Sequence, residues 1–367
     1  MKYVFILGHN PKLSVAEITA VLPQAGLVEE TNSFLILESE GLDCRAILRR
    51  LGGTIKIGEI IGQRIRQEII ADYLKQLKLS GKLNFGLSYY DCKKNSLGME
   101  VKKELKLAGI NSRLVTGKDK ALSSVIVTKN KCHDFLILNN KWLAITRAVQ
   151  EFEEYSARDY GRPVRDMVSG SMPPKLAQIM INLARVPVGA TILDPFCGSG
   201  TVLQEGLLLG YRMIGSDKSQ KAVEDSRNNI QWLIQRLKIG NQNLDSKVKI
   251  FQSNAESLGN KAEQVDAIVT EPYLGPPLKG REGKQEIVKI INNLSELYIG
   301  AFGEFRKILK TGGRIVIIFP SFRVGKEILE LPILEQIKKM GFTQSNRDKL
   351  IYSRPGQKVW RQIYIWQ

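Results

Sequence analysis

The chain has 367 residues, which is enough for two or three domains with hydrophobic cores of their own. Lysine and arginine (54 together) outnumber aspartate and glutamate (37), and the formal net charge is +17. This excess favours a polyanionic partner, a nucleic acid above all, although solubility alone would also explain it. No apolar run approaches the length of a membrane span and the first residues are too short for a signal peptide, so we expect no membrane partner.

The first sixty residues predict a small α+β unit. A capping box at Ser14–Glu17 opens a helix that Pro23 ends, and a second helix is expected at 43–51. The expected strands are residues 2–7, 34–37 and 54–57. This alternation is typical of a ferredoxin-like domain, which we place at residues 1–62.

Residues 63–150 predict a second α+β unit. Its expected helices are 69–79 and 98–108, and its expected strands are 85–90, 125–127, 135–138 and 142–149. Asn139-Asn140 indicates a hairpin turn between the last two strands. Residues 151–170 are charged and interrupted by Gly161 and Pro163, so we interpret them as an interdomain linker.

The remaining segment, residues 171–367, predicts an α/β domain with a doubly wound, Rossmann-like sheet. The expected strands are 190–193, 212–216, 248–252, 265–270 and 314–320, with a closing pair from 342 and at 358–366. The expected helices are 175–184, 202–209, 220–237, 287–309 and 327–340. The uninterrupted apolar run at 314–320 is typical of a buried parallel strand.

A glycine turn follows the first strand of this domain. Asp194-Pro195-Phe196-Cys197-Gly198-Ser199-Gly200-Thr201 separates the apolar run 190–193 from an apolar helix. Glycine allows a positive φ and a close approach of a ligand, and the new helix presents free N–H groups. Such a turn can hold a carboxylate, a phosphate or a polar cofactor. With only two glycines in place, it is not the dinucleotide-binding fingerprint.

An acid follows the second strand. Asp217 lies roughly 20 residues after the glycine turn, the interval at which an acid reaches a ribose hydroxyl on a doubly wound sheet. The alternative is an ordinary strand–helix crossover in which Asp217 only caps the next helix. The spacing leaves both interpretations open.

The cysteines and histidines argue against metal chemistry. Cys44, Cys92, Cys132 and Cys197 are far apart, and the chain has only two histidines, so we expect no metal site. Cys197 is interpreted as a small packing residue rather than a nucleophile. This cysteine usage fits a reducing cytoplasm, the expected location.

Three segments carry a resemblance to a known family. The segment 194–201 resembles motif I of S-adenosylmethionine-dependent methyltransferases that act on exocyclic amino groups of nucleic-acid bases. Gly170–Ala177 resembles the segment before motif I in tRNA guanosine-N2 methyltransferases, which pair a THUMP RNA-binding domain with a methyltransferase domain. Tyr3–Pro11 resembles the start of the branch that methylates guanosine 10 of tRNA. The resemblance implies a seven-stranded methyltransferase domain at 171–367, preceded by a THUMP-like RNA-binding domain at 63–150.

The resemblance also implies a cofactor site for S-adenosylmethionine. The glycine turn with Asp194 would hold the methionine part, Asp217 the ribose and Asn254 the adenine. Asn254 is equally well explained as a turn residue. The full set of expected cofactor-binding residues is Asp194, Phe196, Gly198, Ser199, Gly200, Thr201, Asp217, Lys218, Asn254 and Ala255.

The expected catalytic residues, Glu271, Pro272 and Tyr273, follow the strand 265–270. Here the family carries motif IV, Asp or Asn followed by two prolines and an aromatic residue. Its acid accepts hydrogen bonds from the amine and localises the nitrogen lone pair, while the aromatic ring stacks on the base. This chain departs from the motif, since Glu271 stands in place of the usual aspartate and Tyr273 stands at the position of the second proline. The loop would then either act as expected, bind a base but catalyse poorly, or take a different amine.

Basic residues supply candidate phosphate contacts, any one of which is also explained as a solvated surface charge. They are Lys102, Lys103, Arg113, Lys118, Lys120, Arg158, Arg162, Lys279 and Arg281. The function that the resemblance implies is methyl transfer from S-adenosylmethionine to N2 of a tRNA guanosine, guanosine 10 above all. The alternatives are adenine N6 in DNA, guanine N2 in ribosomal RNA, or a catalytically silent RNA-binding protein. Some relatives need a small activating protein subunit, and the sequence leaves this open here.

Overall fold

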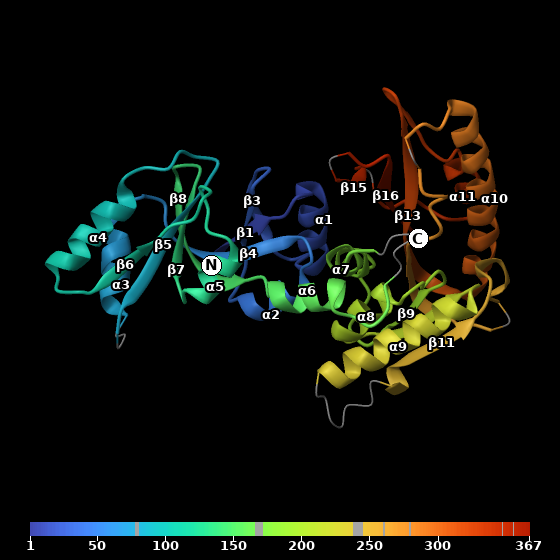
Figure 1. Cartoon of the computed structure of the whole chain (residues 1–367), viewed down its shortest axis with the longest axis horizontal. Coiled ribbons are helices and arrows are strands. Elements are labelled where there is room, and N and C mark those ends of the chain that lie inside the picture. Colours follow the sequence, from blue (N-terminus) through green and yellow to red (C-terminus); the bar gives the residue numbers. More distant parts are fainter. Residues whose placement is uncertain are drawn as a thin grey trace. The chain divides into compact units, whose positions relative to one another are not determined.

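The computed structural model describes residues 1–77, 81–165, 172–237, 245–259, 261–278, 280–346, 348–354 and 356–367. The chain folds into two compact units (Figure 1). The first combines Met1–Val15 with Leu22–Glu154, and the second combines Ala16–Val21 with Tyr155–Gln367. Each unit is built around its own eight-stranded sheet.

The first half of the N-terminal sheet has the predicted ferredoxin-like order of elements, βαββαβ. The elements are β1 (Lys2–Leu7), α1 (Pro11–Val21), β2 (Gly26–Glu30), β3 (Phe34–Glu38), α2 (Cys44–Arg50) and β4 (Thr54–Gly62). The strands lie antiparallel in the order β2-β3-β1-β4, as this fold requires. β1 is central because its apolar residues are buried on both faces. Helix α1 begins at Pro11, earlier than the capping box predicted, and Ser14 instead donates its hydroxyl to the Gly53 carbonyl.

The second half extends the same sheet. Its elements are α3 (Gln67–Gln76), β5 (Leu83–Tyr90), α4 (Leu97–Leu107), β6 (Ser112–Val115), α5 (Ser124–Lys129), β7 (His133–Leu138) and β8 (Trp142–Val149). β8 pairs with β4, so residues 1–62 and 63–150 share one continuous sheet, and the expected boundary falls where β4 ends. Asn139 and Asn140 both have φ near +50°, which confirms the predicted hairpin turn. The THUMP assignment of this half stays a prediction.

Two predicted segments were wrong in type, and the segment expected as a linker contains a helix. Residues 125–127, expected as a strand, lie in helix α5, because the Ser123 hydroxyl caps it and Val127 packs into a small apolar cluster. The expected linker 151–170 begins with a helix, α6 (Phe152–Tyr160), and residues 166–171 lie outside the described residues. The expected helix 327–340 is divided by Pro332 into β14 (Glu327–Leu329) and α11 (Leu334–Lys339).

The C-terminal unit has the predicted methyltransferase-type sheet. Its strands are β9 (Thr191–Asp194), β10 (Arg212–Asp217), β11 (Val248–Gln252), β12 (Val265–Thr270), β13 (Leu309–Val324), β15 (Leu350–Tyr352) and β16 (Val359–Trp366). They lie in the order β11-β10-β9-β12-β13-β16-β15, with β14 paired to β13 at the side. The first five are parallel, and β16 is antiparallel to both of its neighbours. The order reverses between β9 and β12, so a crevice is expected at their carboxyl ends.

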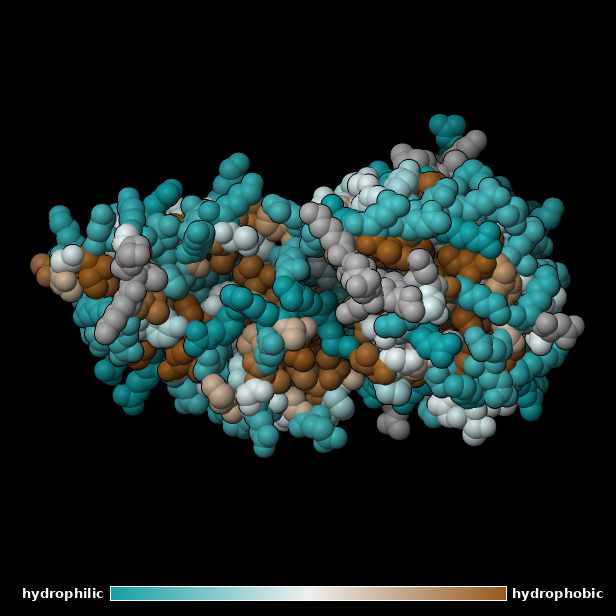
Figure 2. Space-filling view, turned by 90° about the horizontal axis from the view of Figure 1, so that it is seen from below, coloured by the Kyte–Doolittle hydropathy of each residue, from teal (hydrophilic) through white to brown (hydrophobic). Residues whose placement is uncertain are grey.

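Helices cover both faces of this sheet (Figure 1). α7 (Pro174–Leu183), α8 (Thr201–Leu208) and α9 (Gln220–Arg236) lie on one side, and α10 (Lys284–Ile308) and α11 lie on the other. The apolar stripe of α10, which includes Phe302 and Phe305, packs on Ile315 and Phe319 of β13. Most residues on the face shown in Figure 2 are hydrophilic, as expected when apolar side chains fill the cores. No described helix is long and apolar enough to cross a membrane.

Candidate active site

The glycine turn between β9 and α8 has a backbone conformation that residues with side chains rarely adopt. Gly198 and Gly200 have φ values of 50° and 83°, and Gly200 is the N-cap residue directly before α8. A Cβ atom at Gly200 would lie 2.4 Å from the Ser226 hydroxyl of α9. The turn therefore approaches α9 closely, and only glycine fits at residue 200 without displacing a neighbour.

Asp194, the last residue of β9, is a buried acid with 2% of its surface exposed. Its Oδ1 accepts hydrogen bonds from the Phe196 N–H (3.2 Å) and from the Thr270 hydroxyl at the end of β12 (2.6 Å). Burial raises the pKa of Asp194 to about 7, the two hydrogen bonds oppose this rise, and the charges of Asp217 and Glu271 add to it. Within the described residues, no cation forms an ion pair with Asp194.

Asp217 connects the turn to the neighbouring strand. It ends β10, and its Oδ2 accepts from the Gly198 N–H at 3.1 Å while its Oδ1 accepts from the Ser219 N–H at 2.9 Å. The residue that caps α9 is Ser219, and Asp217 holds the backbone of that cap through its bond from the Ser219 N–H. Its neighbour Lys218 is exposed. The contact of Asp217 with a ribose stays a prediction.

Asn254 lies after β11, at the next strand end. Its Oδ1 accepts from the Glu256 N–H at 3.3 Å, and its Nδ2 donates to the Glu256 carboxylate at 3.1 Å. The side chain is exposed and caps a short 3₁₀ turn at Ala255–Ser257, while Ala255 is buried beneath it. The turn role is therefore what this side chain performs here, and an adenine contact stays a prediction.

The loop after β12 places an acid beside an aromatic ring. Glu271 forms an ion pair with Arg361 of β16, with Oε1 and Nε 2.5 Å apart and side chains 13% and 14% exposed. Pro272 is buried, whereas Tyr273 is 49% exposed, as a ring that stacks on a ligand would have to be. The hydroxyl of the buried Tyr298 donates to the Tyr273 carbonyl at 3.0 Å and so fixes the backbone of the loop. Sequence reasoning missed Arg361 and Tyr298, because each is far along the chain from the acid loop.

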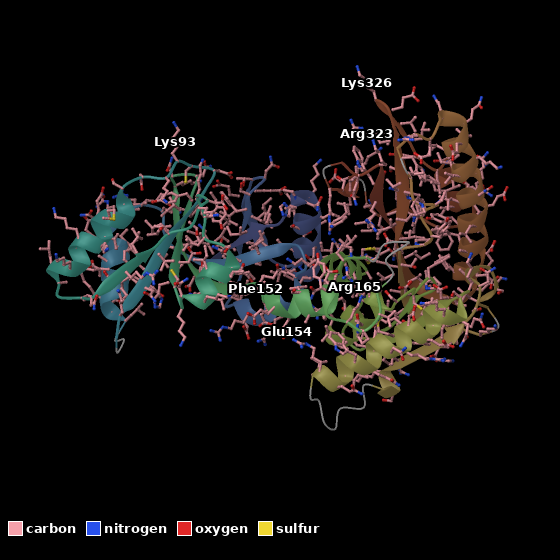
Figure 3. All side chains as sticks on the ribbon, in the orientation of Figure 1. Lys93, Phe152, Glu154, Arg165, Arg323 and Lys326 are labelled. Carbon is pink, nitrogen blue, oxygen red and sulfur yellow. The ribbon has the colours of Figure 1, made fainter. Side chains whose placement is uncertain are left out.

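The expected RNA contacts divide into two groups. Those that the structure exposes are Lys102, Lys103, Arg113, Lys118, Lys120 and Arg281. Lys279 lies outside the described residues. Further exposed cations are Arg323 and Lys326, whose side chains point outward on the β13–β14 hairpin (Figure 3).

The prediction that Arg158 and Arg162 contact RNA is wrong, because both side chains are buried. Arg158 forms a two-pronged ion pair with Glu205 of α8, at 2.6 and 3.2 Å. Arg162 donates to the Thr201 hydroxyl at 2.7 Å, and burial lowers the pKa of its guanidinium. Both arginines bind side chains in the first two turns of α8, and so they stabilise the helix that follows the glycine turn.

Cys197 is buried in the glycine turn, and burial raises the pKa of its thiol well above the usual value. A thiol in this state is a poor nucleophile, and the packing role of Cys197 stays a prediction. All four cysteines are free. No group of three or more histidine, cysteine or acidic side chains in the described part of the chain is arranged to hold a metal ion.

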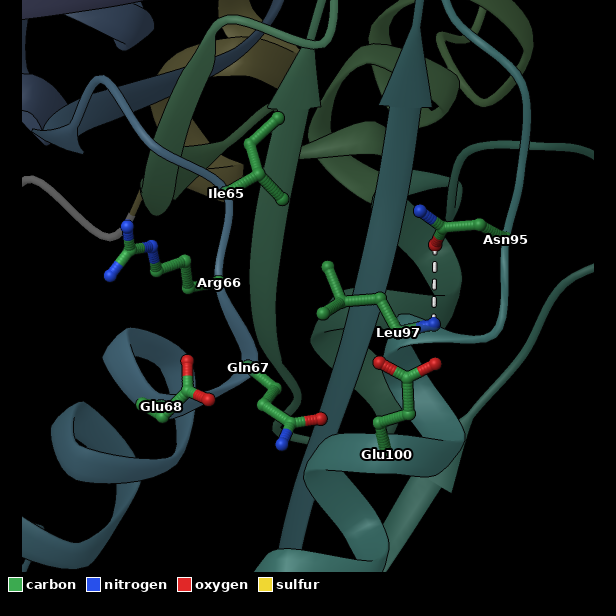
Figure 4. Close-up of a pocket in the computed structure, with 7 residues that line it drawn as sticks. All are labelled: Ile65, Arg66, Gln67, Glu68, Asn95, Leu97 and Glu100. Carbon is green, nitrogen blue, oxygen red and sulfur yellow. Dashed lines mark hydrogen bonds between the residues drawn. The ribbon is translucent and has the colours of Figure 1, made fainter.

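A cavity of about 450 Å³ lies in the N-terminal unit (Figure 4). It is lined by Ile65, Arg66, Gln67, Glu68, Asn95, Leu97 and Glu100. Asn95 accepts from the Leu97 N–H at 3.2 Å and from the Tyr89 hydroxyl at 2.9 Å, so it shapes the start of α4. The lining mixes both charges and holds no unpaired buried acid or base, so the cavity has none of the features of the strand-end site.

Residues 162–349, slightly more than half of the chain, match the family described as RMKL-like, methyltransferase domain. The chain belongs to this methyltransferase family. The matched range contains the glycine turn, Asp217, Asn254 and the acid loop, but it ends before Arg361. Residues 88–228 also match a family described as DNA methylase.

The similarity of this chain to individual relatives extends beyond the residues that match the family. The chain is 27% identical over 283 residues to a tRNA (guanine(10)-N2)-dimethyltransferase of Methanothermobacter thermautotrophicus, covering 74% of this chain and 77% of the relative. It is 25% identical to the enzyme of the same name from Pyrococcus abyssi, covering 100% and 99% of the two chains. The structure of TrmN from Thermus thermophilus superposes with a TM-score of 0.56 at 16% identity, covering 100% and 99%. That likeness supports the fold over both units.

Proposed function

We propose that this chain is a methyltransferase that transfers a methyl group from S-adenosylmethionine to the exocyclic N2 amine of a guanosine in tRNA, with guanosine 10 as the candidate position. The full-length similarity to the Pyrococcus relative supports the substrate. The observation that carries the proposal is the Thr270–Asp194 hydrogen bond, which joins the glycine turn and the acid loop at one edge of the sheet. Cofactor and acceptor sites must adjoin in this way for direct transfer.

The site fits a cationic cofactor. Asp194 is a buried carboxylate with two hydrogen-bond donors and no ion pair among the described residues, and Asp217 and Glu271 add negative charge around it. A buried acid in this state gains most from a cationic ligand. S-adenosylmethionine carries a sulfonium and an ammonium group, and when bound it supplies an electrophilic methyl group. Asp194 and the turn 196–201 would hold its methionine part, Asp217 with Lys218 the ribose, and Asn254 with Ala255 the adenine.

The acid loop would act on the acceptor amine. The nitrogen lone pair of a guanine amine is delocalised into the ring, so the amine is a weak nucleophile. A hydrogen bond from the amine to Glu271 localises the lone pair, and the exposed ring of Tyr273 stacks on a base withdrawn from its helix. The buried Pro272 and the Tyr298 hydrogen bond hold the loop, so that little reorganisation is needed.

The N-terminal unit would bind the body of the tRNA. Its exposed Lys102, Lys103, Arg113, Lys118 and Lys120 are the proposed phosphate contacts, with Arg281 beside the acid loop. This proposal includes a THUMP domain at 63–150 beside the ferredoxin-like 1–62, and a methyltransferase domain at 171–367 after the segment 151–170. Four free cysteines support a cytoplasmic location. A small activating protein subunit is a further candidate partner of the chain.

The direct test is methyl transfer from labelled S-adenosylmethionine to an unmodified tRNA pool, followed by nucleoside analysis. The parent should form N2-methylguanosine, and Glu271→Ala should lose it, whereas the exposed control Glu335→Ala on α11 should not. Methyladenosine as the product would instead favour the activity suggested by the DNA methylase match. Cofactor binding without any product, even with a candidate subunit added, would favour a silent RNA-binding protein.

A further inference from the structure

Three acids meet at the carboxyl ends of the parallel strands. They are Asp194, Asp217 and Glu271, and the charges of the last two raise the pKa of the first. Across the described part of the chain, Glu271 alone among them has an ion-pair partner, and that partner is Arg361. The protein thus neutralises Glu271 with its own arginine. In the described residues, Asp194 and Asp217 have no cation of their own.

The sheet shows why this pair needs long side chains. β13 lies between β12, which Glu271 follows, and β16, which carries Arg361. Two strand spacings separate them by about 9–10 Å. In β16, Arg361 lies opposite Pro320 of β13, beyond the level at which β12 ends. An aspartate at residue 271 would be one methylene shorter, so the departure from the motif IV acid and the presence of Arg361 have one common explanation.

The bond leaves half of the carboxylate available. Arg361 Nε binds Oε1 of Glu271, and Oε2 has no hydrogen-bond partner within the described residues. A guanidinium binds in a fixed plane and remains charged, so it orients a carboxylate as well as neutralising it. A free glutamate side chain would instead rotate among several rotamers and lose that orientation.

We propose that Arg361 is a positioning residue: it fixes Oε1 of Glu271 so that Oε2 faces the acceptor amine. This inference rests on the proposed methyl transfer and deepens it. It assigns a role to a strand outside the matched family range, and it explains how a glutamate serves where the motif has a shorter acid. Arg361 itself contacts neither the methyl donor nor the amine in this arrangement.

The test compares Arg361→Gln, Arg361→Lys and Glu271→Asp in the full chain, with kcat and KM measured for tRNA methylation. We expect Arg361→Gln to lower kcat about 10²-fold with KM for S-adenosylmethionine changed less than about threefold. Arg361→Lys, which keeps the charge but loses the planar geometry, should recover part of this loss. Glu271→Asp should fall as far as Arg361→Gln, because the shorter acid does not reach Arg361.

A double-mutant cycle separates positioning from a merely structural role. In a Glu271→Gln background, Arg361→Gln should cause no further loss of kcat, because its effect acts through the acid. Melting temperature and S-adenosylmethionine affinity identify any variant that fails to fold, and Arg212→Gln, exposed at the opposite end of β10, is the matched control. Equal activity of Arg361→Gln and parent, or fully additive losses in the cycle, would overturn the inference alone. A parent that methylates no nucleic acid would overturn the proposed function and this inference together.

Discussion

Each unit of the molecule contains a buried aspartate, and their surroundings differ in one respect. Asp134 in β7 is fully buried and forms an ion pair with Lys56 at 2.6 Å, while Ser88 and Thr146 donate to its two oxygens. Asp194 in β9 is buried to the same degree, but its two donors are a hydroxyl and an N–H. Asp134 has its own cation, whereas Asp194 has none in the described ranges.

We interpret this difference as the one between a structural acid, Asp134, and the proposed cofactor-binding acid, Asp194. Burial of an acid is costly, and the protein offsets that cost for Asp134 by joining β4, β5, β7 and β8 through one polar cluster. At Asp194 no cation offsets this cost, and burial raises the pKa of its carboxyl to about 7. A group held in this state is best explained by a ligand that completes it. Burial alone would not have distinguished the two residues.

The largest effect is expected from removing the cation of the structural acid. Lys56→Met leaves Asp134 buried and uncompensated, which should lower the free energy of unfolding by about 3–5 kcal/mol. Chemical denaturation followed by circular dichroism measures this loss. Adding Asp134→Asn should restore most of it, because the charge that Lys56 neutralises is then gone. If the single and double variants were equally unstable, the ion pair would not be what holds the cluster.

The matching change at the functional acid should have the opposite character. Asp194→Asn removes the charge that the proposed site offers to the cofactor, so S-adenosylmethionine affinity should fall about 10²-fold, or ~2.7 kcal/mol. The ligand-free protein should be as stable as the parent or more so, since a neutral amide replaces a desolvated acid. Calorimetric titration and thermal unfolding of one preparation give both values. A variant that binds the cofactor normally would remove Asp194 from the binding site.

A smaller effect is expected in the glycine turn. Gly200→Ala introduces a methyl group at φ 83° and against the Ser226 hydroxyl, so we expect a loss of about 1–3 kcal/mol in unfolding free energy. Gly325→Ala is the matched control, because Gly325 also has a positive φ but no atom within 4 Å of the added group. The control should lose only about 1 kcal/mol. Equal losses would show that the approach of α9 does not constrain the turn.

A further effect, spread over several pH units, is a pH dependence of the ligand-free protein. The folded pKa of Asp194, about 7, lies above the unfolded value of 3.8, so the folded state binds more protons between these pH values. Its contribution to stability should therefore fall as pH rises from about 4 to 7, by at most about 1.4 kcal/mol per pH unit. The difference between the unfolding curves of parent and Asp194→Asn isolates this contribution. Parallel pH profiles would contradict the elevated pKa.

The sequence was sufficient for the parts of the site that are local in the chain. Gly198, Gly200 and Asp217 could be placed because strand, turn and acid follow one another within about 25 residues, and the Asn139-Asn140 turn was predicted for the same reason. Helix α5 was missed because its β-branched residues favour a strand in isolation. Arg361 could not be found, since it meets Glu271 across the intervening strand β13 and is 90 residues away in the chain. Arg158 was misassigned because its partner, Glu205, is visible only once α6 and α8 are folded.

The measurement that most directly tests the contrast between the two acids is the proton balance of cofactor binding. Titration of the parent with S-adenosylmethionine at pH 6, in buffers of different ionisation enthalpy, reports the protons released on binding. Asp194, with a pKa of about 7 in the free protein, is mostly protonated at that pH and should ionise when the cationic ligand arrives. We expect the parent to release close to one proton more than Asp194→Asn does. Equal proton release by the two proteins would show that Asp194 does not ionise when the cofactor binds, which would contradict its proposed role.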